Sequence, residues 1–195
     1  MGKISMKGSI LLAPVPSVFI TSKNTDGKTN VFTVGWIGVA CTRPPMITVA
    51  IRPERLSYEY IKNTGEFVIN LPNRDMVKAL DYCGVKSGRT SNKFEDMNLG
   101  VEDCSKVSVP MIKKSPVTLE CKVKNITPLG SHDLFLAEIV QVNVEESIID
   151  LKGKIHLEKA DLVAYSHGEY FSLEKDILGT FGFSVRKKSK PRNKK

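Results

Sequence analysis

A succession of short β-type segments, each bounded by turn-forming residues, constrains the fold of this chain more than any other feature. Asp26-Gly27 favours a tight hairpin turn, and Arg43-Pro44-Pro45 breaks the chain between two further segments. The segments are apolar or alternating runs at positions 17–21, 30–36, 46–51, 66–71, 117–126, 134–144 and 162–165. Many short strands with few helices predict a mainly β barrel or sandwich, and closure into a barrel removes exposed sheet edges.

Only two segments have helical character. Positions 56–62 predict a short helix that begins beside Ser57. Positions 73–82 predict a second helix, which Asn73 can cap and Gly84 can end. The apolar residues that share one face of this second helix are Met76, Val77, Leu80 and Cys83.

The positive charge of the chain is concentrated at its C-terminal end. The 195 residues carry a net charge of +8, from 29 lysines and arginines against 21 acidic residues. Seven of these bases and no acid lie within 186–195, so the other 22 bases nearly balance the 21 acids. We therefore expect one domain over 1–185 and a basic, disordered tail over 186–195. The nearly neutral domain argues against nucleic acid as a partner.

Several classes of catalytic chemistry leave no signature in this sequence. No dinucleotide-binding glycine motif, P-loop or nucleophile elbow occurs. The three histidines lack the spacing of metal ligands, so no metal site is expected. The four cysteines form no C-x-x-C pair and are expected to be reduced thiols, with a redox role left open for Cys41. An enzyme of this kind would depend on a bound organic cofactor.

The hydropathy pattern gives no sign of a membrane protein. No run of about 18 apolar residues occurs, so no transmembrane helix is expected. The early apolar run at 10–15 is broken by Pro14 and lacks the layout of a secretory signal. We therefore expect a cytoplasmic protein without a membrane partner.

Two segments carry side chains suited to binding an anion. One runs from a buried strand through two arginines to the start of a helix, and the other is a polar, basic loop. The donors are Arg52, Arg55 and Ser57 in the first segment and Ser87, Arg89 and Lys93 in the second. Arginine presents a forked donor to phosphate oxygens, and a helix N-terminus adds free N–H groups. Taken alone, these patterns are more typical of solvated arginines and of a flexible connector.

An ordered set of motifs resembles a known family over positions 8–185. The motifs are Asn30-Val31-Phe32-Thr33-Val34-Gly35-Trp36, Arg43-Pro44-Pro45, Ile51-Arg52, Ser57-Tyr58, Phe67-Val68-Ile69-Asn70, Ser87-Gly88-Arg89, Lys93-Phe94, the segment 130–139, Tyr165, Gly168-Glu169-Tyr170 and Leu178-Gly179. In this order they resemble the flavin-reductase-like, FMN-binding split-barrel family, and most of all its flavoredoxin branch. The resemblance implies a six-stranded Greek-key split β-barrel with a few helices, and a homodimer that holds FMN near the subunit interface.

The same resemblance implies which residues surround the isoalloxazine ring. Trp36 stands where the family places a residue beside the ring, and the strand end at Ile51 and Arg52 faces the flavin. His132, in the family's G-x-H motif, stands near the approach of the nicotinamide and is the candidate catalytic residue. Core packing for Trp36 and a solvated position for His132 remain the alternatives. Asp133 departs from the threonine common in the family, which weakens the expectation of a phosphorylated nicotinamide nucleotide, or of any nicotinamide nucleotide, as a substrate.

The phosphate of FMN is assigned by the resemblance to the two anion-binding segments. Arg55 and Ser57 match the residues that grip the ribityl phosphate, with serine in place of the more frequent threonine. Ser87, Arg89 and Lys93 belong to the loop that closes the same site.

These observations lead to three hypotheses for the function. The first is an FMN-dependent oxidoreductase that passes electrons from NADH or NADPH through flavin to free flavin, a ferric complex or a partner protein. The second is an FMN-binding electron-transfer protein that does not itself oxidise a nicotinamide. The third, more distant hypothesis is a nucleic-acid-binding β-barrel, which the near-neutral domain disfavours.

Overall fold

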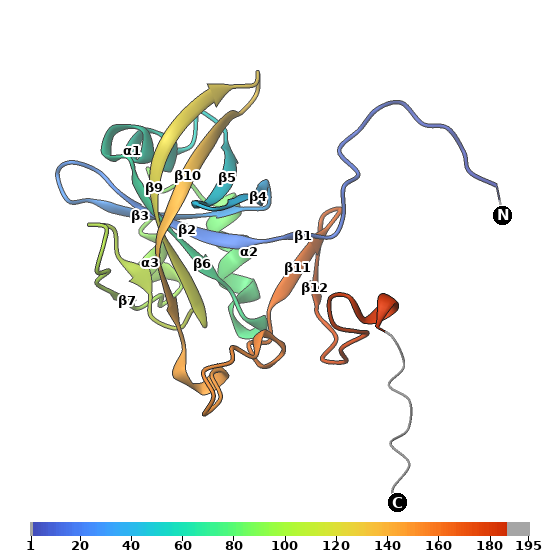
Figure 1. Cartoon of the computed structure of the whole chain (residues 1–195). Coiled ribbons are helices and arrows are strands. Elements are labelled where there is room, and N and C mark those ends of the chain that lie inside the picture. The colour runs from blue at the N-terminus through green and yellow to red at the C-terminus, as the bar shows by residue number, and fades with distance from the viewer. Residues whose placement is uncertain (1, 187–195) are drawn as a thin grey trace, which may run out of the picture.

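The computed structural model describes residues 2–186, and its main body is a single curled sheet (Figure 1). Seven strands lie in the order β3-β2-β6-β9-β10-β5-β4, and every neighbouring pair is antiparallel. They are β2 (Val18–Lys23), β3 (Thr29–Val34), β4 (Ile37–Thr42), β5 (Pro45–Ile51), β6 (Glu66–Leu71), β9 (Val117–Pro128) and β10 (Asp133–Val144). The predicted mainly β class is confirmed, with seven strands in this sheet where six were expected.

The two edge strands of this sheet are consecutive in the chain. β3 and β4 lie at opposite ends of the strand order, yet only Gly35 and Trp36 join them. Such a short connection requires the sheet to curl until its edges meet, which makes it a barrel. The N–H of Ala50 in β5 donates to the carbonyl oxygen of Trp36 at 2.9 Å, where the edges approach. We call the line along which β3 meets β4 and β5 the seam.

The barrel is filled by apolar side chains that alternate along its strands. In β2, Val18 and Ile20 point into the barrel, while Phe19 between them packs on the outside against the helix that follows β6. The buried residues of the interior are Val18, Ile20, Phe32, Val34, Ile47, Val49, Ile51, Ile61, Phe67, Ile69, Cys121, Phe135 and Ala137. Phe19 of β2 and Val31 of β3 are buried on the outer face, so both faces of these two strands are packed.

The helices are short and flank the seam. They are α1 (Leu56–Thr64), α2 (Val77–Val85) and α3 (Lys93–Asp96), with a 3-10 turn, η1 (Arg74–Met76), leading into α2. α1 places Ile61 in the barrel core and ends at Gly65, whose φ of 71° is left-handed. The expectation that Gly84 ends the second helix is wrong, because α2 continues through it to Val85. A Cβ on Gly84 would lie 3.3 Å from the Cβ of Thr33, so glycine allows α2 to approach β3 closely.

Smaller strands complete the structure, and the sequence patterns missed most of them. β1 (Val15–Pro16), β11 (Val163–Ser166) and β12 (Glu169–Ser172) form a three-stranded sheet, and β7 (Val101–Glu102) pairs with β8 (Met111–Ile112). Three further 3-10 turns are η2 (Glu146–Ile148), η3 (Leu157–Lys159) and η4 (Phe183–Val185). Of these strands, only β11 was expected, and β4 in the main sheet was missed as well.

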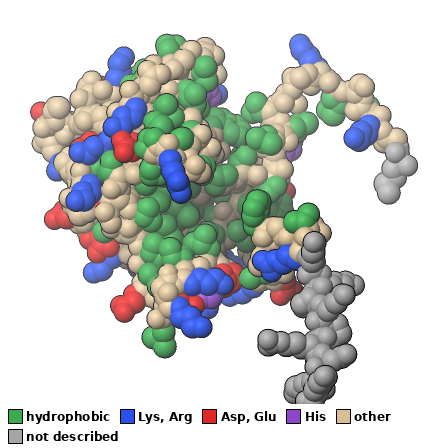
Figure 2. Space-filling view, viewed as in Figure 1, with side chains coloured by type: hydrophobic (Ala, Val, Ile, Leu, Met, Phe, Trp, Pro, Cys, Tyr) green, Lys and Arg blue, Asp and Glu red, His purple; other side chains and the backbone are tan. Residues whose placement is uncertain are grey.

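Both ends of the described chain extend away from the barrel (Figure 1). We call residues 2–14 the N-terminal arm and residues 173–186 the C-terminal segment. Their exposed large apolar residues are Ile4, Met6, Ile10, Leu11, Leu12, Leu173, Ile177, Leu178, Phe181, Phe183 and Val185. Figure 2 shows hydrophobic side chains gathered on the barrel face beside them. The single chain therefore leaves much apolar surface uncovered.

Two expectations concern the chain as a whole. Across residues 2–186, no helix combines the length and apolar character needed to cross a membrane. The predicted tail over 186–195 lies outside the described residues, except for Arg186.

Candidate functional site

A polar pocket of about 360 Å³ lies where the two predicted anion-binding segments meet, and we call it the arginine pocket. β3, the β5–α1 connection and the loop after α2 form its walls. The lining residues are Asn30, Phe32, Arg52, Glu54, Arg55, Leu56, Ser57, Lys86, Ser87, Gly88 and Lys93. Five of the eight predicted cofactor-binding residues are among them, so the fold brings the two segments together.

Lys93 is a buried cation in the wall of this pocket. Its side chain is 3% exposed, and Nζ donates to the carbonyl oxygens of Cys83 at 3.1 Å and Lys86 at 3.2 Å. No carboxylate within the described chain forms an ion pair with it. Desolvation lowers the pKa of Lys93 to about 8, and the nearby charge of Arg55 acts in the same direction. Two of the three N–H groups are satisfied, so one remains to donate to an anion in the pocket.

The hydroxyl group of Ser57 is held as a hydrogen-bond donor. Ser57 is fully buried, and its Oγ accepts bonds from Ser22 Oγ at 2.7 Å and from Asn30 Nδ2 at 2.8 Å. A hydroxyl oxygen has two lone pairs, and both are occupied here. The remaining O–H is therefore free to donate to a group in the arginine pocket, which Ser57 lines.

Gly88 keeps this hydrogen-bonded group in place. A Cβ on Gly88 would lie only 2.1 Å from Oδ1 of Asn30, a distance that would force one of the two residues to move. Glycine at position 88 thus lets the loop pack directly against the side chain that orients Ser57.

The arginines of the site differ in how firmly they are held. Arg55 is half-buried, and its Nη1 donates to the carbonyl oxygen of Gly84 at 3.0 Å, so α2 positions it. Arg52 is more exposed and lies 3.4 Å from a carboxylate oxygen of Glu54. Arg89, also predicted as a ligand, lies outside the arginine pocket and donates from Nη1 to the carbonyl oxygen of Glu54 at 3.0 Å.

The N-terminus of α1 adds backbone donors to the same pocket. Its N-cap residue, Arg55, has an extended backbone and makes no side-chain cap. The first N–H groups of a helix have no partner within the helix, and Leu56 and Ser57 of this first turn line the pocket. The positive end of the helix and the basic side chains therefore favour an anion in one place.

A second, smaller pocket continues along the seam and holds three more predicted residues, Trp36, Ile51 and His132, but not Arg89. This rim pocket has a volume of about 150 Å³ and shares Phe32, Arg52 and Arg55 with the arginine pocket. Its other lining residues are Thr33, Val34, Gly35, Trp36, Ala50, Ile51 and His132. Together the two pockets form a groove that runs along β3 from Asn30 to Trp36.

Trp36 and His132 lie at the far end of this groove. Trp36 is 39% exposed, so it is not a core residue. His132 is half-buried, and its Nδ1 lies 2.9 Å from Oγ of Ser131. The next residue, Asp133, accepts a hydrogen bond at 2.6 Å from the hydroxyl of Tyr58, which raises the pKa of that tyrosine.

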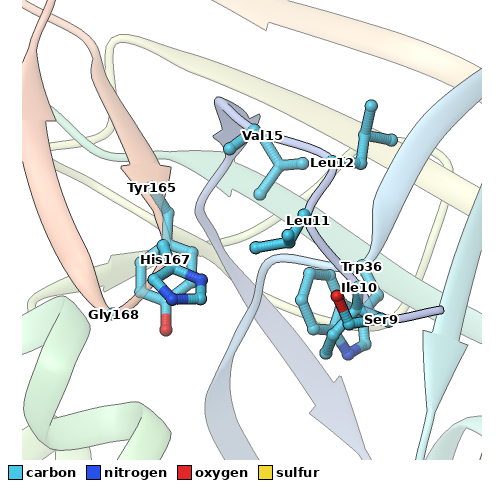
Figure 3. Close-up of a pocket in the computed structure, with 10 residues that line it drawn as sticks. Ser9, Ile10, Leu11, Leu12, Val15, Trp36, Tyr165, His167 and Gly168 are labelled. Atoms are coloured by element: carbon cyan, nitrogen blue, oxygen red, sulfur yellow. The ribbon is translucent and has the colours of Figure 1, made fainter. Parts of the chain in front are cut away.

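Trp36 also borders a mainly apolar pocket of about 280 Å³, which we call the arm pocket. Figure 3 shows Ser9 and Ile10 of the N-terminal arm beside Trp36, with Tyr165 and His167 across the space. The indole ring of Trp36 therefore borders two pockets, the rim pocket and the arm pocket.

Sequence reasoning missed two residues of the site, Ser22 and Asn30. Both lie in strands, and both are buried although they are polar. Ser22 is fully buried and Asn30 is 6% exposed. A polar residue in an apolar strand is a signal for such a role, but only the structure shows that both point at Ser57.

Two other kinds of site, a metal centre and a redox cysteine beside the groove, were also considered in the sequence. Within residues 2–186, no group of three or more histidine, cysteine or acidic side chains is arranged to hold a metal ion. Cys41 lies on β4 and lines neither the arginine pocket nor the rim pocket. What the groove offers is a donor-rich anion site at one end and an aromatic and a histidine side chain at the other, which suits a planar ligand with a phosphate tail.

Comparisons with known proteins agree with this geometry. A model of the flavin reductase like domain family matches residues 11–174. A protein of Pyrococcus abyssi without an assigned function is 31% identical over 172 residues, which cover 88% of this chain and 98% of that protein. The structure of a flavoredoxin from Desulfovibrio vulgaris (Miyazaki F) superposes with a TM-score of 0.86 at 27% identity, covering 94% of this chain and all of that one. A flavoredoxin from Methanosarcina acetivorans gives a TM-score of 0.86 at 28% identity, covering 95% and 100%.

Proposed function

This chain belongs to the flavin reductase like domain family, and from that premise we propose that it is a cytoplasmic, FMN-dependent oxidoreductase. FMN binds along the seam of the barrel, with its phosphate in the arginine pocket and its ring in the rim pocket. Two electrons pass from NADH or NADPH, by way of the flavin, to an acceptor such as free flavin, a ferric complex or a partner protein. The nicotinamide nucleotide leaves in its oxidised form.

The single observation that carries this proposal is the buried, unpaired cation Lys93. A buried charge without a counter-ion costs free energy, and a phosphate in the arginine pocket would remove that cost. Ser57 and the first turn of α1 add hydrogen-bond donors at the same place. The hydroxyl of Ser57 accepts two bonds from the protein and keeps its own O–H for a ligand. The donor set therefore fits the dianionic phosphate of FMN.

Each group of residues has a distinct task in this proposal. Lys93, Arg55 and Ser57 bind the phosphate, and Ser87 closes the site from the loop. The backbone at Ile51 and Arg52 and the side chain of Trp36 orient the ring. FMN supplies the reversible electron chemistry that no side chain in the groove possesses.

His132 is the proposed catalytic residue. It lines the ring end of the groove, where the nicotinamide would approach. Its imidazole can donate or accept a hydrogen bond at the reacting edge and keep the nucleotide in register. The arm pocket on another side of Trp36 leaves room for an acceptor.

One observation favours a second candidate function. Asp133 places a carboxylate next to His132, and Tyr58 holds it in position. A fixed negative charge there opposes the approach of an anionic nucleotide. The second candidate is therefore an FMN-binding electron-transfer protein that receives its electrons from another protein.

We also propose that the chain functions as a homodimer. The apolar residues of the N-terminal arm and the C-terminal segment are exposed in the single chain, and burial against a second copy would remove them from water. The arm contributes to the arm pocket beside Trp36, so association would also shape the surroundings of the ring.

Absorption spectroscopy tests the proposed function directly. We expect the purified protein to be yellow, or to take up added FMN with quenching of the flavin fluorescence. Anaerobic addition of NADH or NADPH should bleach the bound flavin within the turnover time of the enzyme. A protein that takes up no FMN would refute the proposal, whereas flavin binding without bleaching by either nucleotide would select the electron-transfer alternative.

A further inference from the structure

The arm pocket has no task in binding FMN, but it adjoins the place of the flavin ring. It shares only Trp36 with the rim pocket and no lining residue with the arginine pocket. A molecule in the arm pocket would therefore lie next to the same side chain as the flavin ring, without displacing the flavin. Such a place suits a second reactant that takes electrons while FMN stays bound.

The lining of the arm pocket shows which kind of acceptor it suits. It contains no lysine, arginine, aspartate or glutamate. Aliphatic residues 10–13 of the N-terminal arm line it, and the rings of Trp36 and Tyr165 lie across the space from each other (Figure 3). An anionic acceptor such as free FMN would lose hydration there and meet no cation in return. The lining therefore favours an uncharged aromatic acceptor, and a volume of about 280 Å³ limits it to one or two rings.

The wall that β11 and β12 contribute to this pocket is held from behind. Tyr165 of β11 packs edge-on against Tyr170 of β12, with 5.4 Å between the ring centroids. The hydroxyl of Tyr170 donates to Oδ1 of Asp81 in α2 at 3.3 Å. The hairpin is thereby joined to α2, so this wall is formed before a ligand binds.

His167 is the residue of the arm pocket that can exchange protons near neutral pH. With Gly168 it makes the two-residue turn between β11 and β12, and its φ of 50° is left-handed. Asparagine, aspartate or glycine is usual in such a turn, and a histidine there costs free energy. Within the described residues, hydrogen bonds join the other two histidines to Ser131, Asp150 and Glu158, but none joins the imidazole of His167. An unfavourable residue with an uncommitted imidazole thus lines the pocket.

Resting on the proposed function, we propose that the arm pocket binds a quinone of one or two rings as the electron acceptor, and that His167 supplies protons to a quinone oxygen. A quinone is uncharged and planar, accepts two electrons readily and requires protons on its oxygens, which matches an apolar pocket with one imidazole.

The reaction balances with the donor already named. The quinone gains two electrons and two protons and leaves as the hydroquinone. NADH or NADPH loses two electrons and one proton by way of the flavin, so each turnover draws one further proton from the solvent. His167 passes protons to the quinone oxygen, and water restores them to the imidazole.

Fluorescence of Trp36, the single tryptophan of the chain, tests the binding of the quinone. The flavin-free protein is titrated with 1,4-naphthoquinone and with 1,4-naphthoquinone-2-sulfonate, which carries a negative charge on the same rings. We expect saturable quenching by naphthoquinone and about tenfold weaker binding of the sulfonate. Leu11→Asp should weaken naphthoquinone binding by about tenfold, whereas Ile4→Asp, in the same arm but outside the pocket, should not. Equilibrium dialysis of the FMN-loaded protein should give the same affinity for naphthoquinone.

The variant His167→Asn tests the supply of protons. Asparagine is favoured in the left-handed turn, so the variant should have a Tm no lower than that of the wild type. With the flavin reduced anaerobically by one equivalent of dithionite, reoxidation by naphthoquinone should be about tenfold slower in the variant, at unchanged quinone affinity. Reoxidation by ferricyanide, which takes electrons without protons, should proceed at the wild-type rate.

The outcomes separate this inference from the proposed function. If FMN binds and NADH or NADPH reduces it, but naphthoquinone does not bind saturably, the acceptor site is refuted and the FMN oxidoreductase stands. If FMN displaces the quinone, or the sulfonate binds as tightly as naphthoquinone, the arm pocket is not an apolar acceptor site and the inference also fails. Equal slowing of naphthoquinone and ferricyanide in His167→Asn would refute the transfer of protons. If the protein binds no FMN, the proposed function fails, and the inference fails with it.

Discussion

At the scale of single residues, the site depends on a few buried polar groups whose bonds are incomplete without a ligand. Lys93 has one N–H group without a partner, and Ser57 has its lone pairs occupied by Ser22 and Asn30. Burying such groups lowers the stability of the folded chain. Groups of this kind are therefore typical of sites where a ligand completes their hydrogen bonds.

Replacement of Lys93 by methionine tests the role of its charge. Lys93→Met should lower FMN affinity by about thirtyfold, close to 2 kcal/mol, because a charge-assisted bond to the phosphate is lost. Riboflavin, which lacks the phosphate, should bind as before. The stability of the variant should change little, because removal of a buried charge offsets the loss of its bonds to the carbonyl oxygens of Cys83 and Lys86. Equal losses for FMN and riboflavin in fluorescence titrations would contradict a phosphate contact at Lys93.

The pKa of Lys93 predicts how the stability of the protein and its affinity for FMN change with pH. Burial lowers this pKa from 10.5 to about 8, so the folded chain releases the proton earlier than the unfolded chain. Between about pH 8 and 10.5 the unfolded state binds more protons, so the contribution of Lys93 to the free energy of unfolding increases with pH in that window. FMN affinity should change in the opposite sense, falling above about pH 8 with a slope that approaches tenfold per pH unit. Titrations at pH 7 and 9 should show this fall in the wild type and no fall from this source in Lys93→Met.

Gly88→Ala tests the support of Ser57. The new methyl group would displace Asn30, whose Oδ1 lies 2.1 Å from the position of that Cβ, and would release the bond from Asn30 to Ser57. We expect FMN affinity to fall by about tenfold, the value of one hydrogen bond to a charged group. Gly100→Ala is the matched control, because nothing lies within 4 Å of a Cβ at that glycine. If the two variants bound FMN equally well, the packing of Gly88 on Asn30 would have no part in the site.

At the scale of elements, the loop between β10 and β11 is stabilised by one histidine. His156 Nε2 lies 3.0 Å from Asp150 Oδ2, and its Nδ1 lies 2.6 Å from Glu158 Oε1. Both ring nitrogens therefore face carboxylates, which favours the protonated ring. The bonds to Asp150 and Glu158 raise the pKa of His156, while His156 and backbone N–H groups hold the pKa of Asp150 at about 2.

The pH range over which this cluster stabilises the loop follows from these directions. The raised pKa of His156 gives a contribution that is complete below about pH 6.5 and is lost as pH rises through the folded value. The lowered pKa values of the carboxylates give a contribution that is complete above about pH 4.5 and is lost in stronger acid. His156→Gln should therefore lower Tm by a few degrees near pH 5.5 and have little effect near pH 9. Calorimetry of both proteins at the two pH values measures the difference, and a Tm loss independent of pH would contradict this origin.

At the scale of the whole molecule, the uncovered apolar termini predict association of two chains. Light scattering coupled to gel filtration should give a mass of twice 21.6 kDa. Placing charges in the C-terminal segment, with Leu178→Asp and Phe181→Asp, should shift the protein to the monomer, because both residues are exposed and apolar. Leu151→Asp, in an exposed loop, is the control and should leave the mass unchanged. A wild-type monomer at micromolar concentration would contradict the homodimer.

Much of the β architecture could be predicted from local patterns, because alternation and turn residues act over a few positions. β6 was expected at 66–71 and has those bounds, and β9 and β10 were found to within two residues. β4 was missed because Gly38 weakens its strand pattern, and its pairing with β5 stabilises it instead. The end of α2 was misplaced because Gly84 serves close packing on Thr33, a contact between residues far apart in the sequence.

The sequence by itself determined the mainly β class and the two basic, hydroxyl-bearing segments, since these depend on which residue types stand next to one another. Only the tertiary structure decided that Lys93 is buried without a counter-ion, that Ser22 and Asn30 turn the hydroxyl of Ser57 into a donor, and that Trp36 borders the arm pocket. Burial and hydrogen-bond direction arise when segments far apart in the chain meet, so no local pattern contains them. The curling of the sheet, which joins its edge strands through Gly35 and Trp36, is what brings those segments together.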